Sequence, residues 1–122
     1  GLEAYHLAPK TISSVALGRK MFQQAMAEKP DIDAIFCTND DLAVGVLLEC
    51  QAQQYDVPGK MAIAGFHGLE IGRARLQKIA SVITPRFEIG KTAADILIKR
   101  LNGKDAPGSV NLGYQIYYGD TL

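Results

Sequence analysis

The sequence predicts an α/β fold whose strands form a mostly parallel sheet. Along its 122 residues, short apolar and β-branched segments alternate with longer segments whose apolar residues recur every three or four positions. Strands that alternate with helices are joined by right-handed crossovers, which bring the strands into one sheet. A hydrophobic fraction of 48% with 21% charged residues is ordinary for one compact domain and excludes a disordered chain.

The N-terminal third predicts a helix between two strands. Leu2–His6 is consistent with a strand, and hydroxyl side chains at 11–14 offer caps for a helix that ends near Glu28. Pro30 prevents that helix from continuing. Ala34–Cys37 is apolar without alternation, which is typical of a parallel strand covered on both faces.

A second helix is expected over 41–54, capped by Asn39, Asp40 or Asp41. It is apolar nearly all round, whereas a helix on the surface of a sheet needs only one apolar stripe. Two interpretations stay open. Either the helix is buried between other elements, or a second face of it contacts another chain.

The second half of the chain predicts five further elements. Two buried strands are expected at Met61–Gly65 and Ser81–Thr84, with a short helix at 69–75 between them. An amphipathic helix follows at Arg86–Leu101. Alternating apolar residues then predict a half-exposed strand over 110–118.

Charge and composition exclude several classes of protein. Thirteen basic and thirteen acidic residues give a formal net charge of +0, so this stretch lacks the basic surface that coats DNA. No apolar run approaches the ~18–20 residues of a membrane span, and no signal peptide opens the chain. Cys37 and Cys50 lie in apolar stretches, which predicts buried free thiols in a reducing compartment.

Polar and aromatic residues follow two of the predicted strands. Ligands of open α/β sheets bind beyond the carboxyl ends of the strands, so the two sets would edge one cleft if their strands are neighbours. Such a cleft suits a small polyol or acid. Each residue also has a purely structural interpretation: a helix cap, a turn histidine or core filling. The candidate ligand residues are Phe36, Asn39, Phe66 and His67.

No catalytic motif accompanies these residues. The glycines at 65, 68 and 72 do not have the spacing of a dinucleotide-binding loop. The sequence has no Gly-x-Ser-x-Gly elbow, Walker loop or His-Glu-x-x-His. Asp40 and Asp41 lack the third carboxylate or phosphate-cradling loop of a magnesium site. We therefore expect no catalytic residue, metal or cofactor, and a protein that is not an enzyme.

An ordered series of blocks resembles the lactose-repressor (LacI) family of bacterial transcription regulators. The resemblance covers the chain from about Gly18 onward. Within the family, the segment 6–15 and Gly65-Phe-His-Gly are most similar to a gluconate-utilisation repressor. The blocks are AIFCTNDDLAVG at 34–45, Val57-Pro58, MAIAGF at 61–66, ASVIT at 80–84, and Ile89-Gly90 with Ala93.

This resemblance implies a periplasmic-binding-protein-like fold, a three-layer parallel sheet in which two lobes enclose a ligand cleft. Residues 1–84 and 109–122 would form most of the C-terminal lobe, and about 85–108 would be a helix belonging to the N-terminal lobe. The DNA-binding domain of family members would lie outside this chain. The implied protein is a cytoplasmic homodimer that senses a small effector and controls binding to operator DNA.

The resemblance also assigns residues. Phe36 and Asn39 match ligand-contacting positions, and Ser13 falls near an effector-facing position. His67 stands where most relatives have an aspartate, and an imidazole can donate to a carboxylate, so we expect a sugar acid such as gluconate. Val44 and Leu48 are expected at the dimer interface.

The sequence departs from the family pattern in two places, and two other functions remain possible interpretations of it. The cleft arginine of relatives would lie upstream of Gly1, and relatives tend to have an arginine near Gly119. The alternatives to a repressor are a solute-binding protein of a sugar importer, which would avoid free cysteines, and an α/β enzyme that uses His67 as a base.

Overall fold

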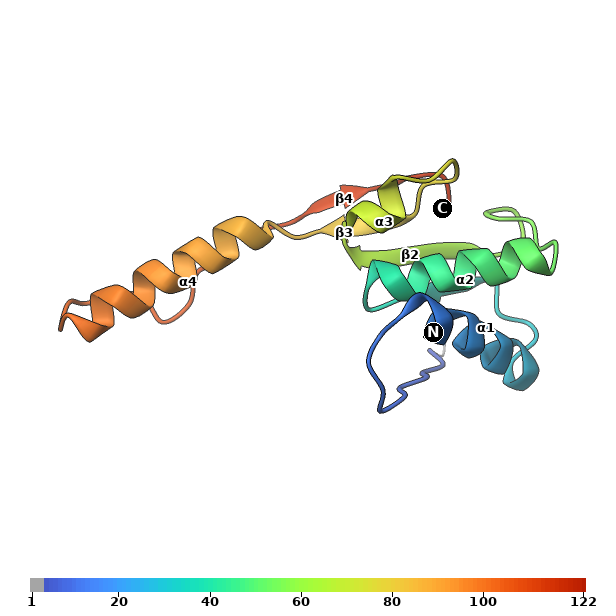
Figure 1. Cartoon of the computed structure of the whole chain (residues 1–122), viewed down its shortest axis with the longest axis horizontal. Helices are drawn as coiled ribbons and strands as arrows, with labels where there is room; N and C mark the ends of the chain where they lie inside the picture. Colours follow the sequence, from blue (N-terminus) through green and yellow to red (C-terminus); the bar gives the residue numbers. More distant parts are fainter. Residues whose placement is uncertain (1–3) are drawn as a thin grey trace.

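The computed structural model describes residues 4–122 and has an α/β fold (Figure 1). Its strands form one sheet in the order β1-β2-β3-β4, in which β1, β2 and β3 are parallel and β4 is antiparallel to β3. The predicted α/β fold with a mainly parallel sheet is confirmed. The elements are α1 Val15–Glu28, β1 Ala34–Phe36, α2 Asp40–Ala52, β2 Ala62–His67, α3 Glu70–Arg73, β3 Ala80–Ile83, α4 Arg86–Leu101 and β4 Gln115–Tyr117.

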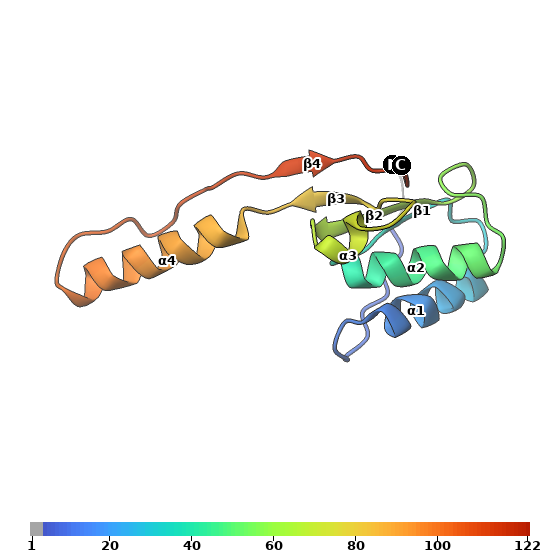
Figure 2. The same ribbon diagram turned by 45° about the horizontal axis from the view of Figure 1, so that its top comes forward.

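The two ends of the chain differ most from the expected elements. The strand expected at Leu2–His6 lies partly outside the described residues, and 4–6 form no strand. The strand expected over 110–118 is reduced to β4, because the chain at 110–114 runs back beside α4 rather than beside another strand (Figure 2). Alternation indicates extended backbone, but a strand also needs a paired neighbour.

Helix α2 packs against the sheet, and α1 packs along α2 (Figure 2). Two glycines allow the close crossing of the helices: a Cβ on Gly18 would overlap the backbone oxygen of Leu42, and one on Gly45 would overlap that of Val15. The buried carboxylate of Glu49 adds polar bonds between the helices, accepting from Arg19 Nε at 2.8 Å and Gln23 Nε2 at 2.7 Å.

The apolar circumference of α2 is explained by burial between the sheet, α1 and α3. Its side chains form much of the core, together with Phe22, Met61 and Ile79. Val44 is only 1% exposed. The prediction that Val44 faces a partner is therefore wrong for this chain, whose own packing covers that side chain. Leu48 is half-buried and keeps some surface.

Helices cover one face of the sheet in the described part of the chain. Ser81 faces α2, because its hydroxyl bonds Asp40 at the start of that helix. Phe36 lies on the opposite face and is 63% exposed. The strand at 34–37 was expected to be covered on both faces. In residues 4–122, helix α2 covers one face of the sheet, and no helix covers the other face. Of the three expected layers, the helical layer on the α2 side and the sheet are therefore present.

The C-terminal tail closes the sheet at the end opposite the carboxyl ends of the parallel strands. Thr121 is fully buried, and its hydroxyl accepts from Ala80 N at 2.9 Å and donates to Ile63 O at 2.6 Å. Ile63 N in turn donates to the Thr121 carbonyl at 2.8 Å. One residue thus joins β2 to β3. A Cβ at Gly119, which has φ +56°, would lie 2.5 Å from the Lys78 oxygen, so this turn requires glycine.

Helix α4 extends away from the rest of the molecule (Figures 1 and 2). It has the expected amphipathic sequence, yet none of its residues is buried. Phe87, Leu97 and Leu101 are among its exposed apolar side chains. The assignment of this helix to a second lobe stays a prediction, and its unpacked apolar surface is consistent with it.

Candidate functional site

The carboxyl ends of β1 and β2 bring three of the predicted ligand residues together. The two strands are parallel neighbours, with Phe36 opposite Ala64, so both end at the same edge of the sheet. The ring centroids of Phe36 and Phe66 are 6.4 Å apart, and those of Phe66 and His67 are 4.7 Å apart, each pair in an edge-to-face arrangement. Phe36, Phe66 and His67 form an aromatic cluster at this edge.

His67 is presented by unusual backbone geometry. Its φ is +93°, in a region that side-chain-bearing residues rarely adopt, and Gly68 follows with φ +66°. The imidazole is half-buried, and its Nδ1 lies 3.3 Å from Thr84 Oγ1. Because Thr84 occupies Nδ1, Nε2 is the ring nitrogen left to contact a ligand.

Asn39 is the N-cap of α2. Its Oδ1 accepts from Leu42 N at 3.0 Å, which satisfies one of the free amides of the first turn. The capping interpretation is therefore confirmed, and it does not exclude ligand binding. With Oδ1 used in the cap, the Nδ2 amide is the group that can donate to a ligand hydroxyl or carboxylate.

Asp40 forms a network that the sequence did not reveal. Its carboxylate is 1% exposed and accepts from Ser81 Oγ at 2.6 Å and from the Leu69 amide. Ser81 Oγ also accepts from Gly68 N at 3.1 Å. The sequence offered Asp40 as a cap or a weak magnesium ligand; the structure uses it to bind the turn that follows His67.

Ser13 lies in the exposed loop before α1, where its neighbour Ser14 is the N-cap and accepts from Leu17 N at 3.1 Å. Among the described residues, no recorded hydrogen bond joins Ser13 to the aromatic cluster. Its effector-facing role stays a prediction.

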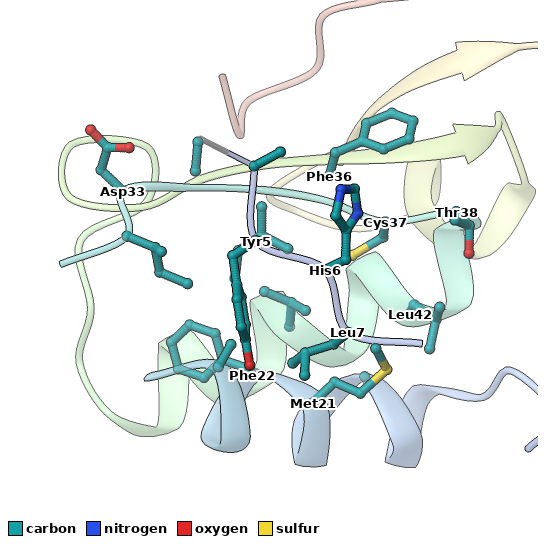
Figure 3. A pocket seen from close by; sticks show the side chains of 17 residues that line it. Tyr5, His6, Leu7, Met21, Phe22, Asp33, Phe36, Cys37, Thr38 and Leu42 are labelled. Atoms are coloured by element: carbon teal, nitrogen blue, oxygen red, sulfur yellow. The ribbon is translucent and has the colours of Figure 1, made fainter. Parts of the chain in front are cut away.

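A cavity of about 510 Å³ lies beside β1, between the N-terminal segment and α1 (Figure 3). Tyr5, His6 and Leu7 line it from one side, and Met21 and Phe22 from the other. Phe36 reaches its rim, but Asn39, Phe66 and His67 do not line it. This cavity is therefore not the predicted ligand cleft. The aromatic cluster lies outside it, at the edge of the sheet.

The cysteines and acidic side chains offer no metal site in the described residues. Cys37 and Cys50 are free and buried, as predicted, and burial raises the pKa of Cys37 to about 12 and that of Cys50 to about 11. Such thiols are unreactive. Within residues 4–122, no cluster of three metal-ligating side chains occurs, and no helix is long and apolar enough to cross a bilayer.

Residues 3–122 match the family model of the periplasmic binding protein-like domain. The HTH-type transcriptional regulator IdnR of Escherichia coli (strain K12) is 48% identical over 122 residues, which are 99% of this chain and 37% of IdnR. A solved LacI-family regulator from Silicibacter pomeroyi superposes with a TM-score of 0.74 at 36% identity, over 91% of this chain and 34% of that one. The chain belongs to the LacI family of transcription regulators.

A second solved relative of this LacI-family domain is the transcription regulator GntR from Chromobacterium violaceum. It superposes with a TM-score of 0.83 at 38% identity, over 91% of this chain and 41% of that one. The domain spans little more than a third of the length of IdnR. These relatives are transcriptional regulators rather than enzymes.

Proposed function

We propose that this LacI-family domain is the effector-sensing part of a transcriptional repressor and that its effector is a small sugar acid, gluconate or a close analogue. In the full-length protein, binding of this effector would control binding to operator DNA. The observation that carries the proposal is the imidazole of His67, held against Phe66 and Thr84 at the edge where Asn39 begins α2.

The chemistry of this edge suits an anionic polyol. The faces of Phe36 and Phe66 offer apolar surface for the C–H groups of a sugar chain. Asn39 Nδ2 and His67 Nε2 are polar groups within the same edge, and a protonated imidazole donates from both nitrogens and carries a positive charge. An aspartate at this position would instead repel a carboxylate and favour a neutral sugar.

The open shape of the site supports a two-lobe mechanism. The exposed side chain of Phe36 and the lack of any buried residue in the amphipathic helix α4 are both consistent with a second body that covers them. The chain spans little more than a third of the length of IdnR. Effector bound between two lobes favours one lobe arrangement over another. It shifts DNA binding only by its difference in affinity for the two, typically ~1–3 kcal/mol.

The test is calorimetric titration of the full-length protein with gluconate and with a neutral polyol of equal length. We expect the wild type to prefer gluconate and His67→Asp to lose that preference. His6→Asp is the matched control, because it makes the same change at the chain's other histidine, which lines the separate cavity. An unaltered preference for the acid in His67→Asp contradicts the charge-reading role.

The proposal includes a cytoplasmic homodimer. The free, buried thiols suit a reducing compartment. Since Val44 is buried, the partner surface would comprise Leu48 with the exposed Ile71 and Leu76, which lie in and after α3, the helix packed beside α2. Leu76→Asp, which disturbs no core contact, is expected to shift sedimentation of the full-length protein toward monomer. Unchanged sedimentation contradicts this surface.

A further inference from the structure

The buried side chains of Asp40 and Ser81 form hydrogen bonds to the turn that carries His67. His67 and Gly68 both have positive φ, which glycine adopts freely but which a histidine keeps only where surrounding contacts fix it. The next two amides supply those contacts: Gly68 N donates to Ser81 Oγ and Leu69 N donates to the Asp40 carboxylate. Ser81 Oγ donates in turn to Asp40, which closes the network.

The surrounding backbone leaves room for this carboxylate. A Cβ on Gly65 would overlap Asp40 Oδ1, and one on Gly72 would lie 3.5 Å from the Asp40 Cβ. Asp40 is thus enclosed by β2, β3 and α3 while it belongs to α2. Both of its oxygens accept a hydrogen bond, so its charge is compensated by donors from the His67 turn and the neighbouring strand.

We propose that Asp40 is a positioning residue of the effector site: acting with Ser81, it fixes the left-handed turn at 67–68 and thereby aims the His67 imidazole at the effector. The proposal rests on the proposed function for its ligand. Asp40 itself contacts no effector, because it is buried beneath the turn. Asp40 links the start of α2, which Asn39 caps, to the turn at the end of β2, which carries His67. It therefore holds the side chains of Asn39 and His67 in a fixed relative position.

The main test is a double-mutant cycle in the full-length protein, with gluconate as the probe. Asp40→Asn keeps the shape of the side chain but leaves one acceptor oxygen for two donors. We expect it to weaken gluconate binding at least tenfold, and by less than twofold when His67→Ala is already present. An equal factor in both backgrounds means that Asp40 does not act through His67, and overturns the proposal.

Asp41→Asn is the matched control. It removes the same charge from the same helical turn, and Asp41 makes no side-chain hydrogen bond recorded among the described residues. Its gluconate affinity is expected to stay within twofold of wild type. If it weakens binding as much as Asp40→Asn does, the helix-end charge and not the turn network is responsible. Should Asp40→Asn fail to fold, Ser81→Ala takes its place in the cycle.

A measurement without ligand separates this inference from the proposed function. Amide hydrogen exchange at Gly68 and Leu69 reports the network directly, and we expect Asp40→Asn to speed it at least tenfold, with Cys37 N, which bonds Ala64 O, unchanged. Unchanged exchange at both turn amides overturns the inference. If the wild type binds no sugar acid while Asp40→Asn still loosens the turn, the proposed function fails and the network stands.

Discussion

At the scale of single residues, His67 combines a side chain proposed to bind the effector with an unfavourable backbone conformation. A φ of +93° is natural for glycine and costs other residues on the order of 1–3 kcal/mol. A glycine would fit the turn better but would remove the imidazole from the cluster with Phe66. If His67 binds the effector as proposed, histidine at this position favours binding over stability.

The backbone strain at His67 predicts a difference in stability between two substitutions that remove its imidazole. Both His67→Gly and His67→Ala remove the imidazole, so both lose selectivity for the acid. Only glycine relieves the backbone strain, so we expect His67→Gly to be more stable than His67→Ala by about 1 kcal/mol in urea unfolding. Equal stabilities contradict the claim that the turn is strained.

Glu49 predicts a dependence of stability on pH. Hydrogen bonds from Gln23, then from Gln53 and Arg19, lower its pKa from 4.5 to about 2. A pKa lower in the folded than in the unfolded state contributes stability above pH 4.5, and this is lost as the pH falls toward 2. In urea unfolding, the advantage of wild type over Glu49→Gln should therefore shrink across that window. Glu88→Gln, the same substitution on the exposed helix α4, is the matched control.

At the scale of elements, the crossing of α1 and α2 depends on Gly45. Alanine is the better helix former by about 1 kcal/mol, but here its Cβ would overlap the Val15 oxygen. We expect Gly45→Ala to destabilise the chain by about 2 kcal/mol or more, measured by thermal unfolding. Gly90→Ala on α4, where nothing lies within 4 Å, should cause no loss. Similar effects at both positions would show that helix propensity outweighs contact.

Local sequence patterns predicted most of these elements. Periodicity and caps placed α1, α2 and α4 within a few residues, since each is decided by neighbours three or four positions away. Two predictions were wrong: that residues 110–114 form a strand and that the side chain of Val44 faces a partner. Both depend on which distant segment of the chain lies next to these residues, and local patterns do not show that. At the candidate site, the carboxyl-end rule correctly placed Phe36 and His67 at one edge of the sheet, while their role in binding stays a prediction. Asp40 and Ser81 escaped, since a contact across 41 positions leaves no local signal.

At the scale of the whole molecule, α4 is an amphipathic helix whose apolar side chains are not buried by the rest of the chain. A helix of 16 residues with no buried residue has little stability in water. In the 122-residue chain, we expect α4 amides to exchange within about tenfold of unstructured rates, while α2 amides stay protected. In the full-length protein α4 should gain at least about a hundredfold protection. Equal exchange in both contexts would contradict the assignment of 85–108 to a second lobe.

Thr121 has a consequence for biosynthesis. Its hydroxyl reaches a strand partner 58 positions earlier at Ile63 and another 41 positions earlier at Ala80. A ribosome releases the chain from its N-terminus, so β2 and β3 can pair before these two hydrogen bonds form, and the bonds form only after Thr121 has left the exit tunnel. Until then, the Ala80 amide and the Ile63 carbonyl lack the buried partner that they have in the folded chain.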